Sequence, residues 1–209
     1  MPSLTPCTER DSSVVGVREA QRLETRARVF DAAVAEIGRS GLAGADVSAI
    51  ARAAGVVRGT FYFHFPTKAH VLVELERAEE VKIVAALGTR TTSPDDLAAM
   101  LTLLVRQVLA AERRLGPAIF RDMLGLHFSS TRPVEATPGE HPLAGFVIAA
   151  IAEAQAAGQV ASDADPGELG VIFMTGLFAL LATAGPASRA RTALLDRYVM
   201  TIVGGMEAR

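Results

Sequence analysis

The sequence predicts an all-α fold of about nine helices, on three observations. Apolar residues recur at steps of three and four from residue 23 to the C-terminus, which is the period of an amphipathic helix. No stretch alternates apolar and polar residues as a half-buried strand does. Glycine and proline divide the chain into segments of helical length. The 209 residues are enough to bury a substantial core.

The first part of the chain predicts four helices after an unstructured start. Residues 1–17 lack periodicity and are predicted to be a disordered tail. Asp46 favours a helix start, because its carboxylate can accept hydrogen bonds from the first backbone N–H groups. Gly41 and Gly55 favour helix ends, because glycine readily adopts the left-handed conformation of a C-terminal cap. The predicted helices span about residues 23–38, 46–54, 57–64 and 68–87.

The remaining residues predict helices separated by short loops. Ser93 and Pro94 favour a helix start, since serine caps a helix and proline fits its first turn. Residues 129–141, rich in Pro, Thr and Gly, are predicted to form a surface loop. Further helices are predicted within "GPAIFRDMLGLHF" and "PLAGFVIAAIAEAQAAG" and over residues 166–184 and 186–205.

Composition and charge limit the classes of function. The single cysteine, Cys7, excludes a disulfide within the chain. No charged start followed by an apolar run indicates a signal peptide, and the apolar run 171–184 is shorter than the ~20 residues of a membrane span. A cytoplasmic protein without membrane contact is therefore predicted. Residues 1–70 carry nine Arg/Lys and seven Asp/Glu, a weakly basic balance that fits an anionic partner but also arises by chance.

Residues 47–65 meet the physical demands of a helix-turn-helix. Ala51 is small enough for two helices to cross closely, and Gly55 allows the tight turn between them. Phe61 and Phe65 share one side of the third helix and are predicted to anchor it in the core. The outer face and the ends of that helix present groups that can contact phosphates and base edges in a major groove, namely Arg58, Gly59, Thr60, Tyr62, Phe63 and His64.

The stretch "DVSAIARAAGVVRGTFYFHFPTKAHVL" closely resembles the DNA-binding domain of the TetR (tetracycline-repressor-like) transcriptional regulators. The resemblance covers residues 20–72 strongly and continues weakly into "AAGQVASDADPGELGVIFMTGLFALL". It implies a helix-turn-helix DNA-binding domain over residues 18–72 and an effector-binding and dimerisation domain over residues 73–209. The chain departs from the family pattern at Val57, where a capping serine is common, and at Asp46, where threonine is usual.

The resemblance also implies roles for individual residues. Tyr62 would give its hydroxyl group to a phosphate, and the guanidinium fork of Arg58 would read guanine. Lys68 would bind another phosphate with the help of the helix N-terminus. Further DNA contacts are implied for Ser48, Thr60 and His64.

By this resemblance the chain is a transcriptional repressor that a small, mostly apolar effector releases from a palindromic operator. It would act as a homodimer through its last two helices, with the small residues Gly170, Gly176, Ala179 and Ala182 allowing close approach. The candidate effector-binding residues either pack in the core or line an apolar cavity, and they are Phe120, Met123, His127, Phe146, Phe173 and Met174.

Two other classes of function remain open. One is a small all-helical enzyme or carrier for an apolar ligand, and the other is a TetR-like dimer without DNA binding. An enzyme is disfavoured, because the sequence pairs no nucleophile with a base and has no phosphate-binding glycine loop. His64 and His70 lack the neighbouring ligands of a metal site. Catalytic residues, cofactors and metals are therefore not predicted.

Overall fold

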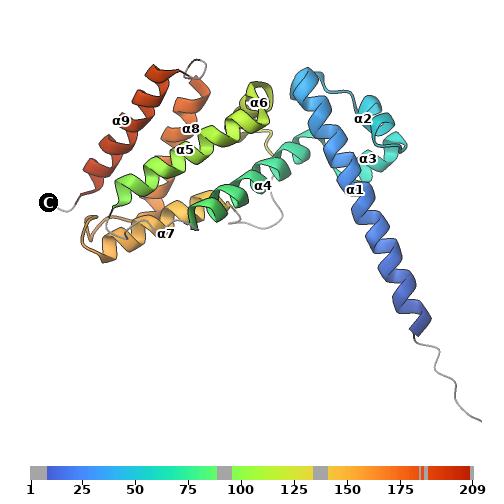
Figure 1. Ribbon diagram of the computed structural model, residues 1–209, viewed down its shortest axis with the longest axis horizontal. Coiled ribbons are helices and arrows are strands. Elements are labelled where there is room, and N and C mark those ends of the chain that lie inside the picture. The colour runs from blue at the N-terminus through green and yellow to red at the C-terminus, as the bar shows by residue number, and fades with distance from the viewer. Residues whose placement is uncertain (1–8, 89–95, 134–140, 184, 186–187, 208–209) are drawn as a thin grey trace, which may run out of the picture. The chain divides into compact units, whose positions relative to one another are not determined.

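The computed structural model describes residues 9–88, 96–133, 141–183, 185 and 188–207. These residues form nine helices, and the one β-type pairing among them is an isolated antiparallel bridge between Val160 and Glu207 (Figure 1). The prediction of an all-α fold of about nine helices is confirmed. The chain divides into two compact units, Met1–Val71 and Leu72–Arg209.

The first unit contains α1 (Glu9–Gly44), α2 (Val47–Ala53), α3 (Arg58–His64) and the start of α4 (Lys68–Gly88). Gly41 interrupts α1 with a φ of 72° and a ψ of 164°. Asp46 caps α2, since its carboxylate accepts the Ser48 N–H at 2.9 Å. Gly55 makes the turn into α3 with a φ of 67°, a conformation that favours glycine. No side chain caps α3, because its N-cap residue is Val57.

α1 begins earlier than the sequence predicts. Residues 9–17 are helical, where a disordered tail over residues 1–17 is expected, and residues 1–8 lie outside the described residues. Residues 16–24 are all exposed, so this part of the helix has no buried stripe that periodicity could detect. An ion pair between Glu19 and Arg22, 2.6 Å apart, adds local support on the helix surface.

Aromatic packing holds α3 in the first unit. Phe61 and Phe65 are fully buried, and their ring centroids lie 6.0 Å apart. The ring of Phe30 in α1 lies 6.1 Å from that of Phe65. Ile50 of α2 is likewise buried, with no exposed area. Because one side of α3 is fixed in this way, its other side has a defined orientation.

The second unit packs the rest of α4 with five further helices around one apolar core. These are α5 (Leu97–Leu115), α6 (Pro117–His127), α7 (Pro142–Ala156), α8 (Pro166–Thr183) and α9 (Arg189–Met206). α8 packs against α6, α7 and α9 (Figure 1). The N-cap of α5 is Asp96, whose carboxylate accepts the Ala99 N–H at 2.7 Å, and the predicted start at Ser93 and Pro94 lies outside the described residues.

α8 is long and apolar enough to cross a membrane by length and composition, with a mean hydropathy of 1.5. A core helix of a globular domain can have the same length and hydropathy. α8 buries one side, including Phe173 and Leu177, and its contacts with α6, α7 and α9 are those of a core helix.

The two glycines of α8 allow close packing inside one chain. A Cβ added at Gly170 would lie 2.6 Å from Cγ1 of Ile148 in α7, and one at Gly176 would overlap the ring of Tyr198 in α9. The interpretation that these glycines allow two copies to approach each other is therefore wrong. The neighbouring helices of the same chain occupy the space in front of both residues.

Candidate functional site

α3 presents an exposed face opposite its buried one. The side chains of Val57, Tyr62 and Phe63 are 74%, 45% and 73% exposed, whereas Phe61 between them is fully buried. Large apolar groups gathered on a surface mark a contact with another molecule. The exposed face of α3 is therefore the first candidate site.

Arg58 and Tyr62 form a pair one helical turn apart on this face. The guanidinium carbon lies 5.8 Å from the centre of the tyrosine ring, and Nη2 donates to the Tyr62 hydroxyl at 3.4 Å. The tyrosine ring in turn stands edge-on to buried Phe61, with centroids 5.3 Å apart. Arg58 keeps most of its five N–H donors for an external acceptor such as a phosphate or a guanine.

Gly59 lies in the first turn of α3, next to Arg58. A Cβ added there would meet no atom within 4 Å, so nothing inside the unit requires glycine. Glycine within a helix costs about 0.5–1 kcal/mol relative to alanine. The missing side chain instead suits a surface that approaches closely from outside.

Lys68 is the first residue of α4. Its side chain binds one carbonyl group near the end of α1 and one directly after that helix. Its ammonium group donates to the carbonyl oxygens of Ala43 at 3.1 Å and Ala45 at 2.8 Å. An ammonium group has three N–H donors, so one remains for an anion. Lys68 therefore has a structural role that the sequence interpretation missed, beside the phosphate contact that it predicted.

The other predicted contact residues are less exposed. Ser48, Thr60 and His64 are half-buried. Burial, and after it the charges of Arg22 and Arg26, lower the pKa of His64, so its ring is neutral at pH 7. A neutral imidazole offers one donor and one acceptor rather than a charge.

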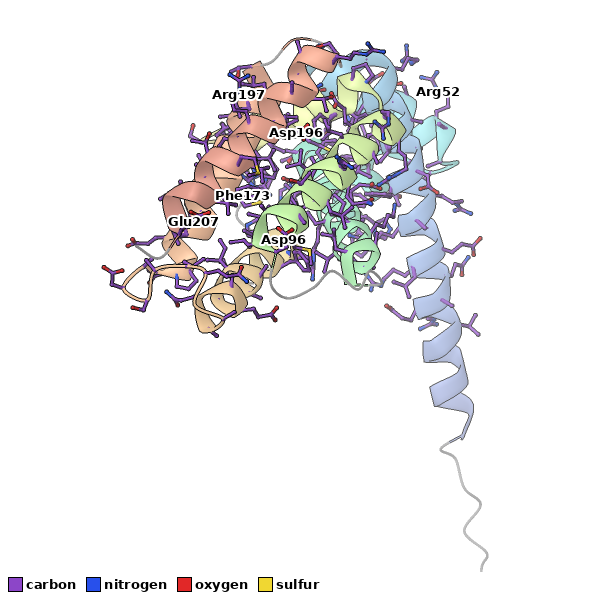
Figure 2. All side chains as sticks on the ribbon, turned by 60° about the vertical axis from the view of Figure 1, so that its left-hand side comes forward. Arg52, Asp96, Phe173, Asp196, Arg197 and Glu207 are labelled. Carbon is purple, nitrogen blue, oxygen red and sulfur yellow. The ribbon has the colours of Figure 1, made fainter. Side chains whose placement is uncertain are left out.

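Arg52 is an exposed cation in the last turn of α2 that the sequence interpretation did not select (Figure 2). Arg52 is exposed, whereas its neighbour Ala51 is buried. The sequence motif does not show which of its residues are exposed, so Arg52 was not selected. Across the described residues, no group of three or more His, Cys, Asp and Glu side chains could hold a metal ion.

The second candidate site is a cavity inside the second unit. The cavity volume that the centre of a water molecule can reach is about 40 Å³. Sites that hold drug-sized ligands have ~300–1,000 Å³, so the cavity is contracted here. Its apolar lining comes from α4 to α8 and consists of Ile83, Val108, Ala111, Leu115, Phe120, Met123, Leu124, Leu143 and Phe178.

The predicted effector-binding residues divide between this lining and the core. Phe120 and Met123 line the cavity, and the ring of His127 packs edge-on against the lining residue Phe178 at 4.7 Å. The other three predicted residues do not line it. Phe146 packs against the core, Phe173 points into it and stacks on Tyr198 at 5.7 Å, and Met174 is buried in it (Figure 2).

Three glutamates of α4 also lie along the cavity. Glu76, Glu79 and Glu80 are 8%, 5% and 6% exposed. The spacing of four, three and four residues through Leu72, Glu76, Glu79 and Ile83 places acidic and apolar residues on one stripe of α4. This spacing is the feature of the sequence that indicates burial of the glutamates. It is easily overlooked, because the acidic run "ELERAEE" resembles an exposed helix face.

Two of these carboxylates have cationic partners. Glu79 lies 2.7 Å from both Lys82 and Arg114. Glu76 lies 2.7 Å from Arg132 and 3.3 Å from His127. For both glutamates the pKa stays below its usual value, because these hydrogen bonds and charges outweigh burial.

Among the residues that the structure describes, Glu80 has no cationic partner. The only described group that donates to it is the N–H of Leu143, at 3.3 Å. Burial in the first place, and the charge of Glu76 after it, raise the pKa of Glu80 to about 7 against the opposing effects of the Leu143 N–H, His127 and Arg132. Glu80 is therefore a buried and weakly compensated carboxylate, and the surface of the cavity itself is apolar.

Comparison with known proteins finds a family match in the first part of the chain. Residues 29–75 match the family described as "Bacterial regulatory proteins, tetR family". Residues 29–75 are thus similar to the DNA-binding segment of the tetR family. The matched tetR segment contains α2, the turn at Gly55, α3 and the first turns of α4, which are the elements that build the exposed face described above.

Two curated relatives match the tetR region of this chain. The repressor KstR of Mycolicibacterium smegmatis is 40% identical over 78 residues, which are 35% of this chain and 38% of that one. The regulator TtgW of Pseudomonas putida is 45% identical over 53 residues, 25% of this chain and 40% of that one. The chain thus spans about two fifths of the length of the curated relatives that it matches.

The likeness of fold to a tetR protein extends over the second unit. The structure of Thermus thermophilus FadR, a tetR-family repressor in complex with lauroyl-CoA, superposes with a TM-score of 0.72 at 21% identity. The match covers 88% of this chain and 96% of FadR. The tetR fold therefore includes the helices that surround the cavity.

Proposed function

We propose that this chain is a cytoplasmic transcriptional repressor of the tetR family that releases its operator DNA when a small molecule binds. The observation that carries the proposal is the exposed face of α3, where Arg58 and Tyr62 are held in place by buried Phe61. Arg58 would read a guanine, Tyr62 would bind a phosphate and Gly59 would let the DNA backbone come close. Ser48, Thr60, His64 and Lys68 would add contacts at the edges of this face.

The repressor would bind DNA as a homodimer through α8 and α9. These helices leave large apolar side chains on the surface, and Val171, Ile172 and Met200 are 63%, 54% and 61% exposed. A second copy would cover them around a two-fold axis. Two α3 helices would then enter successive major grooves of a near-palindromic operator, about 34–36 Å apart.

The effector would bind in the cavity of the second unit. Because the cavity is contracted in this structure, a ligand must widen it, and α4 forms one of its walls. The same helix begins at Lys68, which binds the end of α1. A ligand that favours a displaced α4 would therefore favour the DNA-incompetent state, as release requires.

A gel-shift experiment on genomic fragments, starting with the DNA upstream of the chain's own gene, tests the DNA-binding part. Arg58→Ala should weaken retention, whereas Arg113→Ala, which removes an exposed charge from α5, should not. The logarithm of the binding constant should fall linearly with the logarithm of salt concentration. Salt-independent retention, or equal loss in both variants, would contradict the proposal and favour a dimer without DNA binding or a carrier.

A further inference from the structure

We infer that Val57 and Phe63 read thymines of the operator, by covering the 5-methyl groups that these bases present in the major groove. This reading of thymine rests on the proposed DNA-binding function. It adds a second base to the guanine proposed for Arg58, and it uses two side chains to which the proposed contacts give no role.

Phe63 lies at the outermost point of α3. Residues two positions apart in a helix are about 160° apart around its axis, so Phe63 points away from the fully buried Phe61. Phe63 is 73% exposed, and the ring contact described for it is with its neighbour His64, at 5.0 Å between centroids. Gly59 precedes Phe63 by one helical turn and lies on the same side of α3. A surface that comes close at Gly59 therefore also reaches the ring of Phe63.

Val57 stands at the start of the same helix. It is the N-cap residue of α3, with a φ of −81° and a ψ of 153°, and its carbonyl oxygen accepts the Thr60 N–H at 2.9 Å. Its side chain makes no cap and is 74% exposed. Valine is a poor N-cap residue, so the helix gains nothing from this side chain. An apolar contact outside the chain would use it.

The surroundings of the two side chains favour DNA over an apolar protein surface. Residues 47–73 include no Asp or Glu, but they include Arg52, Arg58 and Lys68. Exposed apolar groups among cations, with no carboxylate between them, suit a polyanion that also offers apolar groups. On the base edges of the major groove that apolar group is the 5-methyl group of thymine. The side chains of valine and phenylalanine have no hydrogen-bond donor or acceptor for the other groups there.

A gel shift with uracil-containing DNA tests the inference. Fragments that the protein retains are amplified with deoxyuridine in place of thymidine, which removes only the 5-methyl group and requires no knowledge of the operator sequence. Covering one methyl group is worth up to a factor of about four in the binding constant. Two side chains in each of two copies would cover four methyl groups, so the wild type should retain the uracil fragment at least tenfold more weakly.

Two variants assign the preference for thymine to its side chains. Val57→Ser and Phe63→Ser should each lower it to roughly the square root of the wild-type ratio, because each removes two of the four contacts. Arg58→Ala should weaken retention of both fragments and keep the ratio, since Arg58 would read guanine. Phe128→Ser changes a phenylalanine at the end of α6 that is 49% exposed, and it should preserve retention and ratio alike.

Single uracils placed in turn along the shortest retained duplex locate the contacts. In each half-site the wild type should lose affinity at two thymines. One of them should become insensitive to uracil in Val57→Ser, and the other in Phe63→Ser. The comparison of thymine with uracil in the wild type needs no variant, so it decides the matter even where a variant does not fold.

The possible results separate this inference from the proposed function. Retention of no fragment at all would contradict the proposed function and the reading of thymine with it. Equal retention of thymine and uracil fragments would leave the proposed function intact, overturn the inference and assign the two side chains to a contact with a protein. A preference for thymine that is unchanged in both variants would also overturn it, because the methyl groups would then act through the shape of the DNA.

Discussion

Replacing Glu80 with glutamine should stabilise the protein above neutral pH and have little effect in acid. A glutamate with a pKa of 4.5 in the unfolded chain and about 7 in the folded protein binds its proton more tightly when folded. Stability is therefore lost as the pH rises from 4.5 through 7. Each pH unit between the two values is worth about 1.4 kcal/mol, which gives a loss of about 3 kcal/mol above pH 7. Glutamine keeps the shape and an acceptor for the Leu143 N–H but carries no charge.

Urea unfolding followed by far-UV circular dichroism at fixed protein concentration measures this effect. The free energy of unfolding of Glu80→Gln minus that of the wild type should increase by about 2–3 kcal/mol between about pH 5 and about pH 8.5. Groups that do not interact with residue 80 titrate equally in both proteins, so the difference reports Glu80 together with its coupling to Glu76 and His127. Glu153→Gln, the same change at an exposed position of α7, should show no such increase. A difference for Glu80→Gln that is the same at both pH values would refute the claim that this carboxylate lacks compensation.

Three changes around α3 should separate stability from DNA binding. Gly55→Ala should lower the free energy of urea unfolding by about 1–2 kcal/mol, because alanine is strained at a φ of 67°. Val57→Ser should raise it by about 1 kcal/mol, since serine can cap α3, which has no side-chain cap. Gly59→Ala should raise it by about 0.5–1 kcal/mol yet weaken retention in the gel shift, because the added methyl group meets only the approaching DNA. Undiminished DNA retention in Gly59→Ala would show that this glycine has no role at the DNA surface.

The helix-turn-helix could be predicted from the sequence because its demands are local. A cap at Asp46, a left-handed turn at Gly55 and two phenylalanines on one side of α3 each leave a mark within a few residues. The hydrogen bonds of Lys68 to the carbonyl groups of Ala43 and Ala45 leave no local mark in the sequence, since they join residues more than 20 positions apart. For the same reason the effector candidates could not be divided between cavity and core.

The burial of three glutamates of α4 and the role of the glycines in α8 were not predicted for a common reason. Whether a residue type is buried depends on which helix packs against it, and that is a property of the tertiary structure. Gly176 faces Tyr198 of the same chain, and the three glutamates face α5, α6 and α7 rather than water. Periodicity predicts that a helix has a buried apolar stripe. A polar residue inside that stripe is, however, assigned to the exposed edge of the helix when only the sequence is known.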